Sequence, residues 1–446
     1  MSAVKNARLT ALKALLRVEE ENGYSNLVLD HGLSQSGLDS RDAAFASALF
    51  YGVLERRITL DYQISHYSKM PLSQMAAAVR EILRMGFYQL LYMDKVPQSA
   101  AVNESVKLTR MMGKDKASGF VNGILRSFIR DGCPCRLPKE TNRDYLPVKY
   151  ACPQWIIELW LKAYGLENTI EMLENLSGRP PLAIRVNSCR TTQEALAEDL
   201  KSEGIEAKQA PGVTDALTLE RSGAVEKLKG FQQGKFHVQD LASQLCCQAL
   251  SPKPGERVYD VCAAPGGKSF TMAQLMENRG ELYAFDLYPA KVRLIQEGAK
   301  RLGLTVIKAG VRDAANPEKE LPPGDKVLCD APCSGLGIIR RKPEIRYKNK
   351  NMLDSLPDLQ YLILCKSAIL TGKNGVLIYS TCTLNPRENN QVARRFLREH
   401  TEFEPYPISL PPGYERNEFD QENEATLFAG KNGTDGFFLS GFRRSR

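Results

Sequence analysis

The stretch that decides the fold is Arg257-Val-Tyr-Asp-Val-Cys-Ala-Ala-Pro-Gly-Gly-Lys-Ser269. It opens with a short apolar run, which is typical of a buried strand, and a helical pattern over residues 269–276 follows it. Two glycines lie between them, and the backbone can approach a ligand closely there because no Cβ intervenes. A strand, a glycine turn and a helix in this order predict a ligand site at the carboxyl end of the strand.

Strands and helices alternate along the chain from about residue 235 onward. Repeated units of this kind predict a doubly wound α/β domain with a parallel sheet. The expected strands are residues 257–262, 282–286, 326–330 and 375–380, and the expected helices are residues 269–276 and 290–302.

The earlier part of the chain follows different patterns. Residues 1–130 repeat apolar side chains at helical spacing and predict an all-helical bundle. A segment rich in glycine and proline, residues 131–138, then breaks any helix. Residues 150–232 mix an expected helix, 153–164, with strand-like pieces such as 182–186, which predicts a small α+β connecting domain. We therefore expect three domains, at residues 1–140, 141–234 and 235–446.

Composition excludes several classes of protein. The 446 residues are 43% apolar and 25% charged, as in globular proteins, and no apolar run is long enough for a membrane span. Neither a signal peptide nor Cys-x-x-Cys spacing is visible, and the four histidines are scattered. The eleven cysteines are therefore interpreted as thiols in a reducing compartment, without bound metal. A cytoplasmic monomer is expected.

The positive charge is concentrated in the first third of the chain. Residues 1–150 hold 21 Lys and Arg against 15 Asp and Glu, and the whole chain has a net charge of +8. This asymmetry predicts a nucleic-acid partner, with an ordinary solvated surface as the alternative. We expect further phosphate contacts from a basic run at Arg340, Arg341, Lys342, Arg346, Lys348 and Lys350.

The glycine turn points to an adenosine ligand without phosphates. A phosphate-binding loop that ended at Lys268 would need glycine where Cys262 stands, and the Gly-x-Gly-x-x-Gly pattern is also absent. Asp286 ends the second expected strand, where an acid can accept hydrogen bonds from both ribose hydroxyls. Asp313, just past a third strand, is a further candidate near the adenine. S-adenosylmethionine is a ligand of this kind.

Two cysteines each follow the carboxyl end of an expected strand, in Asp330-Ala-Pro-Cys333-Ser-Gly335 and in Ser380-Thr-Cys382-Thr383. Carbon 5 of cytosine is a poor nucleophile until a group such as a thiolate adds to carbon 6. A protonated Asp330 could stabilise the charge that develops at N3 of the ring. A lone cysteine on an apolar strand is more often part of the core, as we expect for Cys189, Cys329 and Cys365.

Taken together, these motifs resemble the bacterial small-subunit ribosomal RNA cytosine-5 methyltransferase B family, also called Fmu or Sun. The segments that carry the resemblance are Val238–Ser243, Cys262–Lys268, Asp330–Gly335, Thr381-Cys382, Arg340–Arg346 and Asp435–Phe438. Two further segments, Ala101–Val106 and Phe120–Ile124, resemble the NusB-type RNA-binding helical fold.

The resemblance implies a fold, an activity and a set of site residues. The fold would be an all-α NusB-like domain, an α+β connector and a Rossmann-like methyltransferase domain, and the substrate a single cytosine of 16S ribosomal RNA. By resemblance Cys382 is the nucleophile, Cys333 assists product release and Asp330 contacts the base. The cofactor would be held by Cys262, Ala263, Ala264, Pro265, Gly266, Gly267 and Lys268, with Asp286, Asp313 and Asp330.

Three other hypotheses remain open at this point. The first is a cytosine-5 methyltransferase that acts on transfer RNA or on another ribosomal site. The motifs indicate the chemistry but do not indicate which RNA or which nucleotide is modified. The second is an RNA-binding or antitermination factor without catalysis, against which the cysteine pair and the cofactor turn argue. The third, a thiol redox protein, lacks a Cys-x-x-Cys motif.

Overall fold

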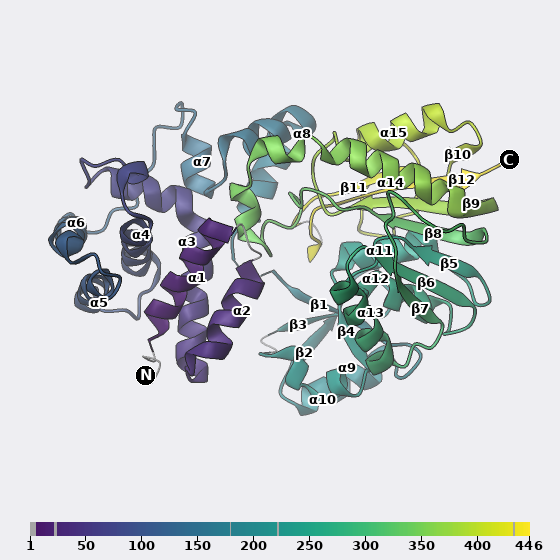
Figure 1. Cartoon of the computed structure of the whole chain (residues 1–446), viewed down its shortest axis with the longest axis horizontal. Coiled ribbons are helices and arrows are strands. Elements are labelled where there is room, and N and C mark those ends of the chain that lie inside the picture. The colour runs from purple at the N-terminus through teal and green to yellow at the C-terminus, as the bar shows by residue number, and fades with distance from the viewer. Residues whose placement is uncertain (1–5, 22–24, 179, 221–222, 431–432) are drawn as a thin grey trace. The chain divides into compact units, whose positions relative to one another are not determined.

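The computed structural model describes residues 6–21, 25–178, 180–220, 223–430 and 433–446. The chain divides into two compact units. The helical unit is Met1–Gly178 with Ile339–Lys348, and the sheet unit is Arg179–Ile338 with Asn349–Arg446 (Figure 1). No helix in these described ranges is long and apolar enough to cross a membrane. The domain boundaries at residues 140 and 234 stay a prediction.

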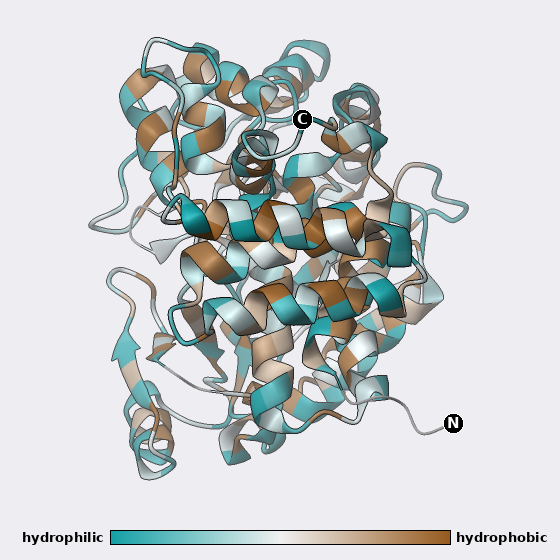
Figure 2. Cartoon of the chain, turned by 90° about the vertical axis from the view of Figure 1, so that its left-hand side faces the viewer, coloured by the Kyte–Doolittle hydropathy of each residue, from teal (hydrophilic) through white to brown (hydrophobic). Residues whose placement is uncertain are grey.

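The helical unit confirms the helical prediction for residues 6–21 and 25–130, and residues 1–5 and 22–24 of the prediction lie outside the described residues. Its buried core is built from apolar side chains that recur at helical spacing, among them Leu12, Phe50, Ile82 and Phe128. The helices that face the viewer in Figure 2 carry both hydrophobic and hydrophilic residues along their length. The helices are α1 (Ala7–Glu21), α2 (Ser25–Ser36), α3 (Ser40–Ser65), α4 (Ala77–Tyr92), α5 (Gln98–Met111), α6 (Ser118–Arg130), α7 (Tyr145–Tyr150) and α8 (Gln154–Glu174).

Helix α8 is longer than the sequence pattern predicts. The expected helix ends at Tyr164, next to Gly165, whose φ of 77° is non-helical. The chain resumes its helix after that residue, because Met172 and Leu173 supply a second buried turn. Trp160, in the first part of α8, is fully buried. The glycine therefore marks a break within the element and not its end.

A segment from the second half of the sequence belongs to the helical unit. It contains a 3₁₀ turn, Pro343–Tyr347, in which the side chain of Arg346 is fully buried. The guanidinium donates hydrogen bonds of 2.6, 3.0 and 2.6 Å to the carbonyl oxygens of Glu55, Ala151 and Leu176. The expectation that Arg346 contacts RNA phosphate is therefore wrong. Lys348 and Lys350 are exposed and remain candidates for such contacts.

The sheet unit begins with a small antiparallel sheet of order β2-β3-β1-β4. Strand β1 is Leu182–Val186, as predicted, and the α+β character of this region is confirmed. The other elements are β2 (Glu206–Gln209), β3 (Ala216–Glu220), β4 (Phe236–Val238), α9 (Gln193–Ser202) and α10 (Lys229–Gln232).

The second, larger sheet has the order β10-β12-β9-β8-β5-β6-β7, and β11 pairs with β12. Neighbouring strands from β9 to β7 run parallel, as predicted. The last strands run antiparallel, so the sheet is mixed. A parallel neighbour needs a crossover connection, whereas antiparallel neighbours do not. The strands are β5 (Arg257–Asp260), β6 (Glu281–Asp286), β7 (Ile307–Val311), β8 (Gly324–Asp330), β9 (Thr371–Thr381), β10 (Phe403–Pro405), β11 (Glu424–Leu427) and β12 (Phe437–Arg444).

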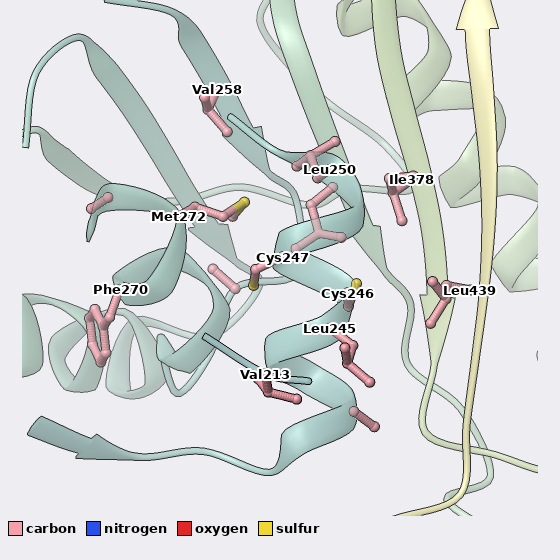
Figure 3. Packing of buried hydrophobic residues seen from close by; sticks show 14 of the residues in the cluster. Val213, Leu245, Cys246, Cys247, Leu250, Val258, Phe270, Met272, Ile378 and Leu439 are labelled. Atoms are coloured by element: carbon pink, nitrogen blue, oxygen red, sulfur yellow. The ribbon is translucent and has the colours of Figure 1, made fainter. Parts of the chain in front are cut away.

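Helices cover both faces of this sheet, because successive strand residues point to opposite sides. Val258 and Ile378 pack with α11, α12 and α13, whereas the following residues, Tyr259 and Tyr379, pack with α14 and α15. Cys246 of α11 and Ile378 belong to the same buried cluster, and Figure 3 shows both side chains. These helices are α11 (Leu241–Leu250), α12 (Gly267–Leu275), α13 (Pro289–Leu302), α14 (Leu356–Leu370) and α15 (Asn390–Glu399).

Candidate active site

The five parallel strands bring polar residues to one edge of the sheet. Strand β5 ends at Asp260, β6 at Asp286, β8 at Asp330 and β9 at Thr381. Because β5 lies between β6 and β8, the glycine turn that follows β5 lies between Asp286 on one side and Asp330 on the other. The edge beyond a reversal of strand order is where open α/β sheets bind ligands.

The turn between β5 and α12 is held by the sheet and requires glycine at one position. The backbone N–H of Ala263 donates to the carbonyl of Phe285 at 2.7 Å. Gly266 has a φ of 111°, and a Cβ there would lie 2.4 Å from the Phe270 ring. A Cβ on Gly267 would meet no atom closer than 3.7 Å. Gly266 therefore serves the backbone conformation, whereas Gly267 leaves space in front of the helix.

Asp286 ends β6, and Asp313 follows the neighbouring strand β7. Asp286 is 8% exposed, and its Oδ1 accepts the backbone N–H of Tyr288 at 3.2 Å. The remaining carboxylate lone pairs can accept ligand hydroxyls. Asp313 follows β7, the neighbour of β6, and its Oδ1 accepts the N–H of Ala315 at 2.8 Å. Asp286 therefore ends the strand next to the turn, and Asp313 follows the strand beyond it.

Lys268 and Asp330 form an ion pair across the front of the turn. The ammonium group of Lys268 lies 2.7 Å from Oδ2 of Asp330, and the Ser380 hydroxyl donates to Oδ1 at 2.7 Å. Burial lowers the pKa of Lys268 but the Asp330 carboxylate raises it, with a raised pKa as the net result. The side chain of Asp330 keeps an exposed fraction of 25%. Asp330 therefore faces a cation, and the ammonium group is a second hydrogen-bond donor that the sequence interpretation did not consider.

Asp260 is an acid that the sequence interpretation missed. It is fully buried at the end of β5, where its Oδ2 accepts the hydroxyl of Ser269 at 2.6 Å. Burial raises the pKa of Asp260 to about 7. Its position inside an apolar strand was the available signal, because a buried carboxylate in such a place is rare without a role in a site.

The two cysteines of the sequence motifs meet. The Sγ atoms of Cys333 and Cys382 lie 3.3 Å apart, although the residues follow different strands. The loops that carry them are joined by a hydrogen bond of 2.6 Å between the hydroxyls of Ser334 and Thr383, both buried. The contact with Cys382, followed by burial, raises the pKa of the Cys333 thiol well above its ordinary value.

The other cysteines differ from one another. All eleven are free thiols. Cys329 is buried in the core, as expected, whereas Cys189 is exposed, so the core prediction for Cys189 is wrong. Cys365 is half-buried, with its sulfur 3.2 Å from Nε2 of His400. In the described part of the chain no three His, Cys, Asp or Glu residues are grouped in a way that could hold a metal ion.

Comparison with known proteins gives the family. A family model described as 16S rRNA methyltransferase RsmB/F matches residues 247–443. The probable ribosomal RNA small subunit methyltransferase B of Bacillus subtilis (strain 168) is 36% identical over 444 residues, which covers 98% of this chain and 99% of that protein. The chain belongs to the RsmB/F family of 16S rRNA methyltransferases. The protein of the same description from Synechocystis sp. (strain PCC 6803 / Kazusa) is 33% identical and covers 99% of this chain and 100% of its own length.

The remaining comparisons agree with this RsmB/F membership in each region. A NusB family model matches residues 5–130, and a model described as the ferredoxin-like domain of RsmF/B-like methyltransferases matches residues 152–226. The crystal structure of PH0851 covers 99% of this chain with a TM-score of 0.84 and 25% identity. That of a methyltransferase homolog protein from Pyrococcus horikoshii covers 68% of this chain, with a TM-score of 0.60 and 27% identity. The resemblance and the fold class stated from the sequence are confirmed.

Proposed function

We propose that this methyltransferase transfers a methyl group from S-adenosylmethionine to carbon 5 of a cytosine in 16S ribosomal RNA. The observation that carries the proposal is the approach of the Cys333 and Cys382 sulfurs to 3.3 Å. Both relatives quoted above are described as acting on small-subunit ribosomal RNA. The NusB-like match at residues 5–130 supports RNA as the partner.

The cofactor would be held along the glycine turn. S-adenosylmethionine supplies the methyl group when it is bound. Residues 262–268 would lie against it through backbone atoms, and the space in front of Gly267 fits such an approach. Asp286 would accept the ribose hydroxyls, and Asp313 would lie nearer the adenine. Asp330 borders the cofactor on the side of the target base.

The ion pair of Lys268 and Asp330 suits the polar edge of cytosine. That edge offers a donor at the N4 amino group and an acceptor at N3. An ionised Asp330 would accept from N4, and the Lys268 ammonium would donate toward N3 as negative charge develops there. Lys268 then takes the role that the sequence interpretation gave to a protonated Asp330.

The covalent steps would use both thiols. The Cys382 thiolate forms a bond to C6 of the ring, and the electron pair of the C5–C6 double bond becomes available at C5 for the methyl group. The C5 proton then leaves and the S–C6 bond breaks, which restores the double bond and the free thiolate. The Cys382 proton passes to solvent before the attack. Once Cys382 is bonded to C6, Cys333 gives its own proton to solvent through a water molecule and then accepts the C5 proton, directly or through a water molecule.

The proposal is tested with cysteine variants on a denaturing gel, with labelled 16S ribosomal RNA transcript and S-adenosylmethionine. Cys333→Ala should accumulate a covalent protein–RNA adduct, because addition proceeds and release is slowed. Cys382→Ala and the double variant should form no adduct and transfer no methyl group. An adduct in Cys382→Ala that is lost in Cys333→Ala would mean that the two roles are reversed.

The identity of the methylated nucleotide is tested in a separate experiment. Bisulfite sequencing of total RNA with and without the gene should reveal one lost 5-methylcytosine in 16S ribosomal RNA. A lost position in transfer RNA, or elsewhere in ribosomal RNA, would favour the alternative cytosine-5 methyltransferase. An unchanged pattern, together with a protein that binds no cofactor in a calorimetric titration, would favour a pure RNA-binding factor.

A further inference from the structure

Two buried side chains outside both cysteine motifs hold the backbone on either side of Cys333. Gln360 lies on α14 and Glu388 lies between β9 and α15. Neither side chain is exposed to solvent. Nε2 of Gln360 donates to the carbonyl of Pro332 at 2.9 Å, and Oε2 of Glu388 accepts the N–H of Ser334 at 2.8 Å. Both neighbours of Cys333 in the sequence are therefore fixed.

The two side chains also bind each other. Nε2 of Gln360 donates to Oε2 of Glu388 at 2.9 Å, so one carboxylate oxygen accepts from both the helix and the Ser334 amide. The other oxygen, Oε1, accepts from the side chain of Asn385 at 2.8 Å. We call Gln360 and Glu388 the clamp.

A carboxylate at residue 388 matches the hydrogen-bond donors that surround it. All the donors that reach it are N–H groups, and they approach both of its oxygens. A carboxylate accepts at both oxygens, whereas an amide of the same size would present a donor at one of them. A buried carboxylate without a cation is costly unless hydrogen bonds satisfy it, so we expect it to be kept for what it positions.

The same loop also carries the second cysteine motif. The backbone carbonyl of Glu388 accepts the hydroxyl of Tyr379 at 2.6 Å, and Tyr379 lies on β9 three residues before Cys382. Glu388 is thereby fixed to the strand of one cysteine through its backbone and to the loop of the other through its side chain. In this arrangement the sulfurs of Cys333 and Cys382 lie 3.3 Å apart.

We propose that Gln360 and Glu388 are positioning residues that hold Cys333 for product release in the two-cysteine reaction. The inference rests on the proposed function and deepens it. Attack and methyl transfer depend on Cys382, whereas the hydrogen bonds of the clamp go to the residues on either side of Cys333. Release depends on the placement of the Cys333 sulfur, and a misplacement of ~1 Å at a reacting group can cost about a hundredfold in rate.

The experiment compares Glu388→Gln, Gln360→Met and Cys333→Ala with the unaltered protein, on unmodified 16S ribosomal RNA transcript with S-adenosylmethionine. We expect steady-state turnover in each clamp variant to fall by about tenfold or more. The first turnover should remain, as a burst of one methyl group per enzyme, and a covalent adduct should appear on the denaturing gel. An adduct must disappear when Cys382→Ala is added.

Glu424→Gln is the matched control, because Glu424 is also a fully buried carboxylate of the sheet unit. It accepts hydrogen bonds from Arg394, Asn390 and the Gln421 amide, and none of these groups belongs to either cysteine motif. We expect Glu424→Gln to lower the melting temperature without a burst or an adduct. A burst and adduct of the same size in this control would overturn the proposal, because general loosening would then explain them.

The remaining outcomes separate the clamp from the proposed function. Unchanged turnover in both clamp variants would overturn the positioning role of the clamp. The same conclusion would follow if the rate of the first turnover fell as much as the steady-state rate in a variant that still binds cofactor. If Cys333→Ala forms an adduct and both folded clamp variants form none, only the clamp fails. If Cys333→Ala itself forms none, the two-cysteine function fails. Either folded clamp variant suffices for the test.

Discussion

At the scale of single residues, Asp260 links the site to the stability of the sheet unit. It is buried without a cationic side chain in hydrogen-bond contact, and its pKa is raised from an ordinary value of 3.8 to about 7. The folded protein therefore binds a proton at a pH where the unfolded chain has lost it. Linkage requires that this contribution to stability is complete below about pH 4 and is lost as the pH rises to about 7.

The corresponding prediction concerns Asp260→Asn. We expect the free energy of unfolding of the unaltered protein to decline between about pH 4 and pH 7 by more than that of the variant, because the amide does not titrate. Chemical denaturation at several pH values measures the two slopes. Parallel pH profiles for the two proteins would show that Asp260 does not titrate in this window.

Asp286 gives a second prediction at this scale. Asp286→Ala should weaken S-adenosylmethionine binding by roughly 1–3 kcal/mol, because charge-assisted hydrogen bonds to the ribose would be lost. Isothermal titration calorimetry measures the change. Glu297→Ala removes an exposed carboxylate from α13 in the same unit and should leave the affinity unchanged. Equal affinities in the two variants would contradict the assignment of Asp286.

At the scale of elements, the segment Ile339–Lys348 is the one whose role the sequence concealed. Its basic residues suggested a nucleic-acid surface, yet the Arg346 side chain donates its hydrogen bonds to three backbone carbonyls inside the helical unit. Glu344 adds a hydrogen bond of 2.6 Å from the hydroxyl of Ser25, at the start of α2. The segment therefore stabilises the helical unit from a distant part of the sequence.

We predict that Arg346→Met lowers the free energy of unfolding of the helical unit by about 3 kcal/mol. A hydrogen bond from a charged donor is worth ~1.5–3 kcal/mol, and the loss of three is offset in part because a buried charge is also removed. Denaturation followed by helical circular dichroism measures the effect. Lys348→Met, an exposed change nearby, should alter stability by less than ~0.5 kcal/mol. Equal midpoints for the two variants would contradict the structural role.

At the scale of the whole molecule, the net charge of +8 and its concentration in residues 1–150 govern binding to a polyanion. RNA affinity should fall steeply with salt, because each neutralised phosphate releases counterions. If the protein makes about three phosphate contacts, a fourfold rise in salt concentration should raise the Kd for RNA by roughly 20- to 40-fold. A filter-binding titration at several salt concentrations measures the slope, and a flat Kd would remove the electrostatic argument.

The exposed lysines of the former basic run provide the internal control. Lys348→Gln/Lys350→Gln should reduce the salt slope by up to about two phosphate contacts. Arg346→Met should leave the slope unchanged in protein that remains folded, since that guanidinium is buried.

The sequence by itself determined the order of the elements and indicated which groups are candidates for the reaction. The glycine turn, Asp286 and the two cysteine motifs are local signals, because apolar periodicity and turn residues record how each short segment folds. The tertiary structure decided which groups meet. Lys268 forms an ion pair with Asp330, and the Arg346 side chain is buried. Gln360 and Glu388 bind the backbone on either side of Cys333. Contacts of this kind depend on which strands become neighbours and on how distant backbone carbonyls and amides are satisfied, and no local pattern in a single sequence contains that information.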